Sequence, residues 1–178
     1  SSDEVVHRYL QGAVDTLLKD IPLRQRTDRA GNGDARLTDF YVSDAEGKRM
    51  PSVRTGMEVT FNLAFECRDG SPPPRTLDAG LFIYTLEGHR IIGVYAADVA
   101  ENLPPVPCAG QFRFTVPNLP LAAGRYRIEA RLTTKRGEAD RPHDGIGLLD
   151  VEPGDFYGTG VRRIRGEAPI LLKGSWTL

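Results

Sequence analysis

Residues 110–133 read GQFRFTVPNLPLAAGRYRIEARLT and contain the clearest structural pattern in the chain. Apolar and polar side chains alternate along residues 111–116 and again along residues 125–132. Because successive side chains of a β-strand point to opposite faces, each segment is predicted to be a strand with one apolar face. Between them, two prolines and a glycine interrupt strand pairing, and the connection carries two leucines of its own. Such a connection favours a crossing between two packed sheets over a tight hairpin.

Similar segments occur before and after this one. Residues 57–67 alternate most regularly, residues 35–43 and 145–151 are also predicted to be strands, and residues 79–86 and 90–97 are apolar on both faces. Turn sequences rich in glycine, aspartate and proline separate the segments, and no helical pattern lies between them. Many short alternating strands predict an all-β fold, an antiparallel β-sandwich of the immunoglobulin-like or jelly-roll-like type.

The two ends of the chain differ from this central region. Residues 1–21 repeat apolar side chains at i+4 spacing after a capping-box pattern, so we predict an N-terminal α-helix. Its apolar face would pack on the sheet of the same domain, or else contact a second chain or an upstream domain. We divide the chain into a helix and linker at 1–32, a β-sandwich at 33–152, and a Gly-rich linker with a C-terminal strand at 153–178. The final strand would pair with the sheet of its own subunit or with that of a neighbouring subunit.

The composition argues against several classes of protein. The 178 residues suffice for one domain with a hydrophobic core plus an appendage, and a formal net charge of −1 gives no indication of nucleic-acid binding. No apolar run approaches the roughly 20 residues that cross a bilayer, and no secretory signal pattern is visible. The two cysteines, Cys67 and Cys108, are too few for a structural zinc site, so we expect no metal and a reducing, cytosolic environment.

Five segments in a fixed order carry a family resemblance. They are Gly33–Leu37, Arg54–Met57, Gly80–Gly88, Val116–Tyr126 and Leu171–Trp176. In this order they resemble the C-terminal domain of Wzt-type proteins, the ATP-binding subunits of ABC transporters that export O-antigen polysaccharide. The resemblance extends over nearly the whole chain after residue 32.

The resemblance implies a non-catalytic carbohydrate-binding β-sandwich. Such a domain recognises the modified non-reducing end of a finished O-antigen polysaccharide and couples it to export. The resemblance also implies a homodimer, in a fold where exchange of the C-terminal strand between subunits is known. It would be held at the cytoplasmic face of the inner membrane by the membrane subunit of the transporter. The ATPase domain would lie upstream of residues 1–32. Since the chain has no Gly-x-x-x-x-Gly-Lys-Ser/Thr loop, ATP and magnesium would bind only in that upstream domain, and we expect no cofactor here.

Sugars present apolar C–H faces and hydroxyl edges, so a site for them needs aromatic surface and a few fixed polar groups. If Leu81 and Ile83 face the core, three aromatic side chains of the neighbouring strands face outward together, and Gly93 leaves a depression beside them. The predicted carbohydrate-binding residues are Phe82, Tyr84, Tyr95, Asn62, Arg90, Arg113 and Arg127. Alternatively, the N-terminal helix covers Phe82 and Tyr84, and they form a second small core.

Two other functions remain open at this point. The first is an immunoglobulin-like protein-interaction module, in which the outward aromatic residues would contact a protein. The second is a glycan-modifying enzyme. The three histidines are scattered, and only His143 lies beside a carboxylate, that of Asp144. Paired acids that act on a glycosidic bond could still be assembled from distant strands of a sandwich.

Overall fold

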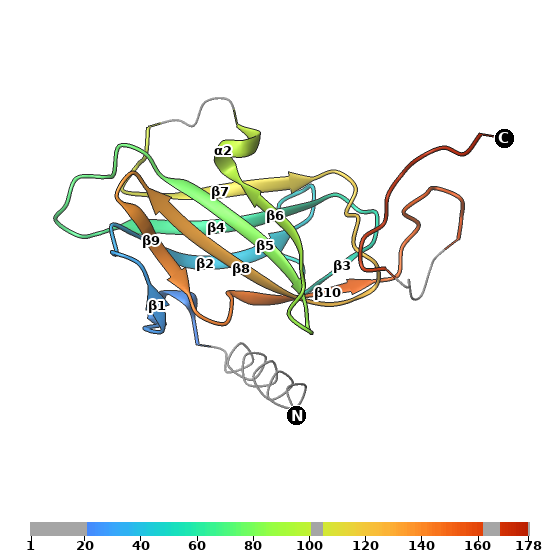
Figure 1. Ribbon diagram of the computed structural model, residues 1–178, viewed down its shortest axis with the longest axis horizontal. Helices are drawn as coiled ribbons and strands as arrows, with labels where there is room; N and C mark the ends of the chain where they lie inside the picture. The colour runs from blue at the N-terminus through green and yellow to red at the C-terminus, as the bar shows by residue number, and fades with distance from the viewer. Residues whose placement is uncertain (1–20, 101–104, 162–167, 178) are drawn as a thin grey trace.

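The alternation in residues 110–133 produces two strands that lie in opposite sheets of a β-sandwich (Figure 1). In the computed structural model, which describes residues 21–100, 105–161 and 168–177, β7 (Ala109–Val116) belongs to a three-stranded sheet. β8 (Gly124–Thr134) belongs to a seven-stranded sheet. Leu119 and Leu121, in the connection, are fully buried. The predicted crossing between sheets is therefore confirmed, since the buried leucines anchor the chain at the end of the sandwich.

The three-stranded sheet has the order β2-β4-β7 and is antiparallel throughout. β2 spans Ala35–Ser43 and β4 spans Val59–Cys67. Phe61 of β4 lies opposite Phe114 of β7, with ring centroids 6.4 Å apart on the inner face. The predicted apolar faces of these strands supply one half of the core.

The seven-stranded sheet is organised around β8, the longest strand. β8 pairs with β5 along one edge, and with β10 and then β9 along the other. The remaining strands extend the sheet, with β6 beside β5, β1 beside β9, and β3 beside β10. The strands are β1 (Arg29–Ala30), β3 (Ser52–Arg54), β5 (Asp78–Thr85), β6 (Arg90–Tyr95), β9 (Gly137–Pro142) and β10 (Gly147–Glu152).

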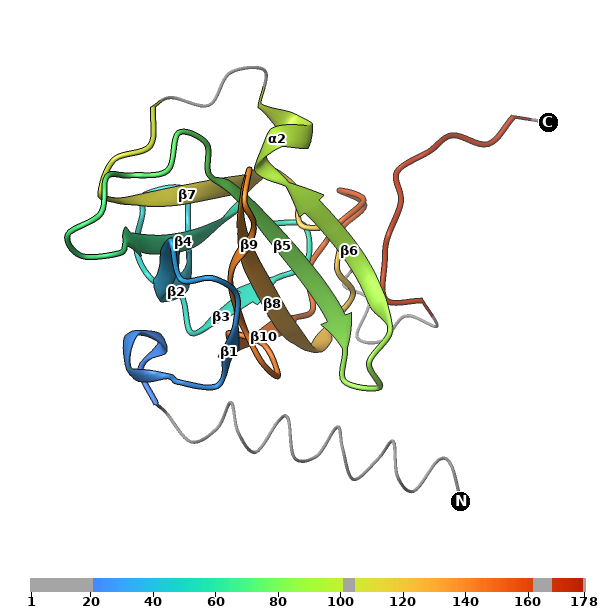
Figure 2. The same ribbon diagram turned by 60° about the vertical axis from the view of Figure 1, so that its left-hand side comes forward.

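One pair departs from the antiparallel prediction, because β3 and β10 run parallel. These two strands are separated by most of the sandwich along the chain, so the direction of β3 is not constrained by a hairpin. Figure 2 shows the two sheets as layers, with β2, β4 and β7 to the left of β8, β5 and β6. Apolar side chains fill the space between the layers in two clusters, around Ile128 and around Leu132 of β8.

The basic segment that the sequence places in the linker packs against the sandwich. It contains the 3-10 helix η1 (Leu23–Gln25) and β1, and Leu23 is buried. The Arg29 Nη1 atom donates to Asp140 Oδ2 at 2.8 Å, and the Leu37 N–H donates to the same carboxylate. Both ion-paired side chains are almost fully buried. This pair fastens the start of the described chain to β2 and β9.

The predicted N-terminal helix lies outside the described residues. Among those residues, no helix is long and apolar enough to cross a bilayer, and the one α-helix is α2 (Ala96–Val99).

The predicted C-terminal strand is reduced to a single bridge. Ile170 bridges Leu121, after which the chain extends away from the sandwich in both views (Figures 1 and 2). Trp176 is fully exposed, at 101% of its reference area, and Leu172 is exposed as well. Two large apolar side chains therefore have no cover from the described part of this chain.

Candidate functional site

Three aromatic side chains lie together on the outer face of the seven-stranded sheet, as the alternation predicts. Leu81 and Ile83 of β5 are buried between the sheets, so Phe82 and Tyr84 project from the opposite face. In the β5–β6 register, Gly80 lies opposite Tyr95 and Phe82 lies opposite Gly93. Tyr95 therefore shares the face of Phe82, and their ring centroids are 5.5 Å apart at an interplanar angle of 81°.

Two strand glycines leave room for these rings. A Cβ atom on Gly80 would lie 2.8 Å from Tyr95 Cε1 and 2.9 Å from Phe82 Cζ, and one on Gly93 would lie 3.2 Å from Phe82 Cδ1. The rings thus occupy the space that a Cβ atom would fill if either glycine were another residue. The prediction of an open depression at Gly93 is wrong, because the Phe82 ring fills it and is itself only 7% exposed.

Arginine side chains lie against the same rings. The guanidinium carbon of Arg131 is 5.1 Å from the centroid of Phe82 and 5.0 Å from that of Tyr95. The Arg90 guanidinium carbon is 5.6 Å from the Phe82 centroid, and that of Arg127 is 4.8 Å from the Tyr84 centroid. These are cation–π distances, at which a ring attracts and orients the cation. The solvent consequently meets guanidinium groups and ring edges rather than bare ring faces.

We call this surface the ring-and-arginine face. Its members are Phe82, Tyr84, Arg90, Tyr95, Arg127 and Arg131. Two carboxylates accompany it, since Glu129 forms an ion pair with Arg127, and Glu138 accepts from Arg141 Nε at 3.2 Å. A hollow of about 230 Å³ lies here, bounded by Phe82, Tyr84, Arg90, Glu129, Ala130, Arg131, Glu138 and Arg141.

Burial has the largest influence on the electrostatics of Tyr84, while the charges of Glu129 and of its two neighbouring arginines act in opposite directions. Burial raises the pKa of the Tyr84 hydroxyl, with a further contribution from the negative charge of Glu129. Tyr84 therefore stays a neutral hydroxyl that is able to donate a hydrogen bond. Arg127 is only 9% exposed, and its Nε, like that of Arg131, is buried without a hydrogen-bond partner in the described part of the chain.

The structure does not bring two of the predicted site residues to this face. Asn62 and Arg113 lie opposite each other on the outer face of the three-stranded sheet, so both sheets separate them from the rings. Asn62 is 2% exposed and donates to Ser43 Oγ at 3.0 Å, which gives it a structural role. Arg113 Nε donates to Gln111 Oε1 at 3.2 Å. Their outward parity is as predicted, but parity does not specify which sheet a strand joins.

Sequence reasoning missed Arg131, Glu129 and Arg141. A signal for the first two was present, because both share the polar parity of Arg127 in residues 125–132. Arg141 could not be placed in this way, since its strand β9 follows a turn and reaches the face only through pairing with β8.

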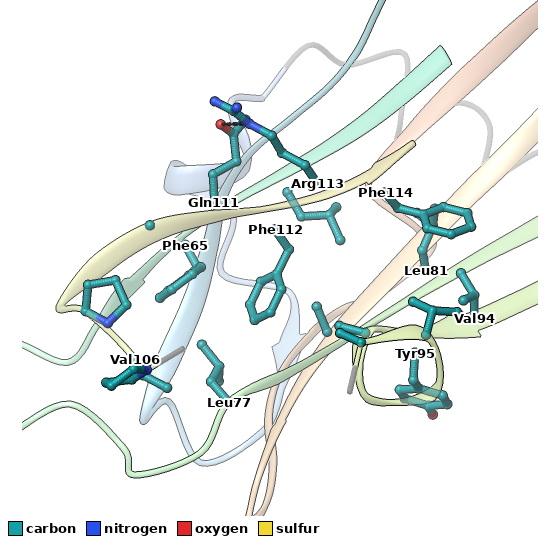
Figure 3. Close-up of a pocket in the computed structure, with 18 residues that line it drawn as sticks. Phe65, Leu77, Leu81, Val94, Tyr95, Val106, Gln111, Phe112, Arg113 and Phe114 are labelled. Atoms are coloured by element: carbon teal, nitrogen blue, oxygen red, sulfur yellow. Dashed lines mark hydrogen bonds between the residues drawn. The ribbon is translucent and has the colours of Figure 1, made fainter. Parts of the chain in front are cut away.

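A second cavity lies between the two sheets, at the edges formed by β6 and β7 (Figure 3). Its volume is about 360 Å³, and its apolar lining includes Phe65, Leu81 and Val94. Figure 3 shows Phe112 on the cavity side of β7 and Gln111 on the other side of the ribbon. Tyr95, Gln111 and Arg113 are the polar side chains of its lining and the rest is apolar, so the cavity offers few donors and acceptors to orient sugar hydroxyls. The ring-and-arginine face is the stronger candidate site for a saccharide.

Comparison with known proteins identifies the family of this chain and a solved structure with a similar fold. Residues 26–158, which include every strand described above, match the family described as the Wzt C-terminal domain. A solved structure described as the crystal structure of the C-terminal domain of wzt is similar, with a TM-score of 0.67 and 20% sequence identity over 92% of this chain and 95% of that chain. No curated protein matches. Since the family match covers well over half of the residues, the chain belongs to the Wzt C-terminal domain family.

Proposed function

We propose that this domain binds the polysaccharide exported by an ABC transporter and that the ring-and-arginine face is its contact surface. The observation that carries the proposal is the gathering of three aromatic rings and three arginines on one outer sheet face of a Wzt C-terminal domain. The domain acts in this role by binding and not by catalysis.

The chemistry of the face suits a saccharide. Guanidinium groups donate several hydrogen bonds in a fixed plane, which matches the hydroxyl edges of a sugar. Tyr84 and Tyr95 are partly exposed, so they offer both a hydroxyl and an apolar ring edge. Because cation–π contacts already hold the arginines, binding would order few additional side chains and would lose little conformational entropy.

We further propose that the ligand is the non-reducing end of the O-antigen chain and not an internal segment. A hollow of about 230 Å³ is small and bounded on several sides by side chains, which suits a terminal unit better than a long polymer. The domain would then report a finished chain to the membrane subunit at the cytoplasmic face of the inner membrane.

Titration calorimetry with O-polysaccharide from the source organism tests this function. We expect intact polysaccharide to bind, and chains trimmed by exoglycosidases from the non-reducing end to bind at least about tenfold more weakly. Tyr84→Ala and Tyr95→Ala should abolish retention of the glycan while circular dichroism shows a folded domain. Arg113→Ala, on the opposite sheet, is the matched control and should bind as the unmodified domain does. Unchanged binding in both tyrosine variants would reject this surface.

A further inference from the structure

We propose that the ring-and-arginine face selects a saccharide unit carrying an acid group, a carboxylate or a phosphate ester, over a neutral unit. This inference rests on the proposed function and names the class of sugar that it recognises. It starts from the charges at the hollow, which three arginines and two glutamates line, while a fourth arginine of the face, Arg127, lies outside this lining. Arg127 pairs with Glu129, and Arg141 pairs with Glu138.

Arg90 and Arg131 are the two arginines left over. Within the ranges that the structure describes, neither forms an ion pair with a carboxylate; each instead lies against an aromatic ring. Both guanidinium carbons are within 6 Å of the centroid of the same ring, that of Phe82, at 5.6 and 5.1 Å. Two positive charges are thus held against one ring, and among the described residues neither has a carboxylate within ion-pair distance, although Glu129 and Glu138 line the same hollow. An anion in the adjoining hollow would relieve their repulsion.

The rings also prepare these arginines for an anion. Stacking limits the rotation of a guanidinium group, so its planar fork of donors is already oriented when a ligand arrives. Such a fork matches the two oxygens of a carboxylate or phosphate, and hydrogen bonds between charged partners are the stronger kind. The Arg131 Nε is buried without a hydrogen-bond partner in the described chain, so this guanidinium has unused hydrogen-bonding capacity.

A neutral sugar would use this arrangement poorly. Its hydroxyls would accept hydrogen bonds from Arg90 and Arg131 but would leave two charges uncompensated in a partly desolvated hollow. An acidic sugar supplies both the acceptors and the charge. The preference should therefore appear as a difference between matched acidic and neutral ligands, and it should weaken as ionic strength rises.

The experiment compares three forms of the O-polysaccharide from the source organism by calorimetry. The first is native, the second has its carboxylates reduced to alcohols with carbodiimide and borohydride, and the third has its phosphate esters removed with hydrogen fluoride. We expect native polysaccharide to bind and one of the two treatments to weaken binding at least about tenfold. The treatment that does so identifies the acid as carboxylate or phosphate.

Arg90→Gln and Arg131→Gln connect this preference to the two residues. Each should weaken binding of native polysaccharide about tenfold and should weaken binding of the charge-depleted form less, so that the ratio of the two affinities falls toward one. Arg113→Gln is again the matched control on the opposite sheet, and thermal unfolding shows whether each variant is folded. If the native and both treated forms bind equally, the preference for acid is refuted while the carbohydrate function stands. If no form binds, the proposed function fails, and this inference fails with it.

Discussion

Replacing Gly80 with alanine would place a methyl group inside the ring cluster on β5 and β6. The added Cβ would lie 2.8 Å from Tyr95 Cε1 and 2.9 Å from Phe82 Cζ, whereas ordinary contacts begin at 3.4 Å. Each ring must therefore move by about 0.5–0.6 Å, and the Arg131 guanidinium, which lies against both, must follow. Gly80 has no positive φ, so the backbone itself tolerates alanine.

The magnitude follows from two opposing effects. Overpacking of this kind destabilises by about 1–3 kcal/mol. Replacing a strand glycine by alanine recovers about 0.5–1 kcal/mol through the lower entropy of the unfolded chain. We therefore expect the Gly80→Ala variant to lose about 0–2.5 kcal/mol of unfolding free energy. Its affinity for native polysaccharide should fall at least about tenfold, because the arginine no longer sits where the rings held it.

Urea unfolding followed by circular dichroism measures the stability, and calorimetry measures the binding. Gly124→Ala is the matched control, since a Cβ there meets only ordinary contacts, the nearest at 3.8 Å. It should leave both quantities unchanged or slightly raise the stability. A folded Gly80→Ala variant that binds the polysaccharide like the unmodified domain would refute the claim that ring packing positions the arginine.

Three further predictions concern the rest of the domain. Arg29→Ala should lower the free energy of unfolding by about 3–5 kcal/mol in urea, because it leaves the buried Asp140 carboxylate without its ion-pair partner. The Arg26 guanidinium lowers the pKa of Asp28, so this group stabilises the fold above its ordinary pKa of about 3.9 and the contribution is lost as pH falls through the lower folded value. The Asp28→Asn variant lacks this contribution, so its melting temperature should fall less than that of the unmodified domain between pH 5 and 2. Deleting residues 171–178 should convert a dimer to a monomer in light scattering if the exposed tail pairs with a second copy, and a dimer that persists would place the interface elsewhere.

Much of the fold could be predicted because alternation is a local property. The period of two in residues 57–67, 110–116 and 125–132 identified the strands and their buried faces, and the two leucines between Val116 and Gly124 indicated the crossing between sheets. The packing of Arg29 against Asp140 could not be predicted, because the two residues are 111 positions apart and meet only once β1 pairs with β9.

The candidate site, like the fold, could be predicted from the sequence only in part. Sequence alone determined that Phe82 and Tyr84 point to one side of their strand, because side-chain direction in a strand follows from backbone geometry. The β5–β6 register then put Tyr95 on the same side. Only the tertiary structure decided that Arg131 covers two of these rings and that Asn62 belongs to the other sheet. Strand pairing joins segments far apart in the chain, and the period of two carries no information about which partner a strand selects.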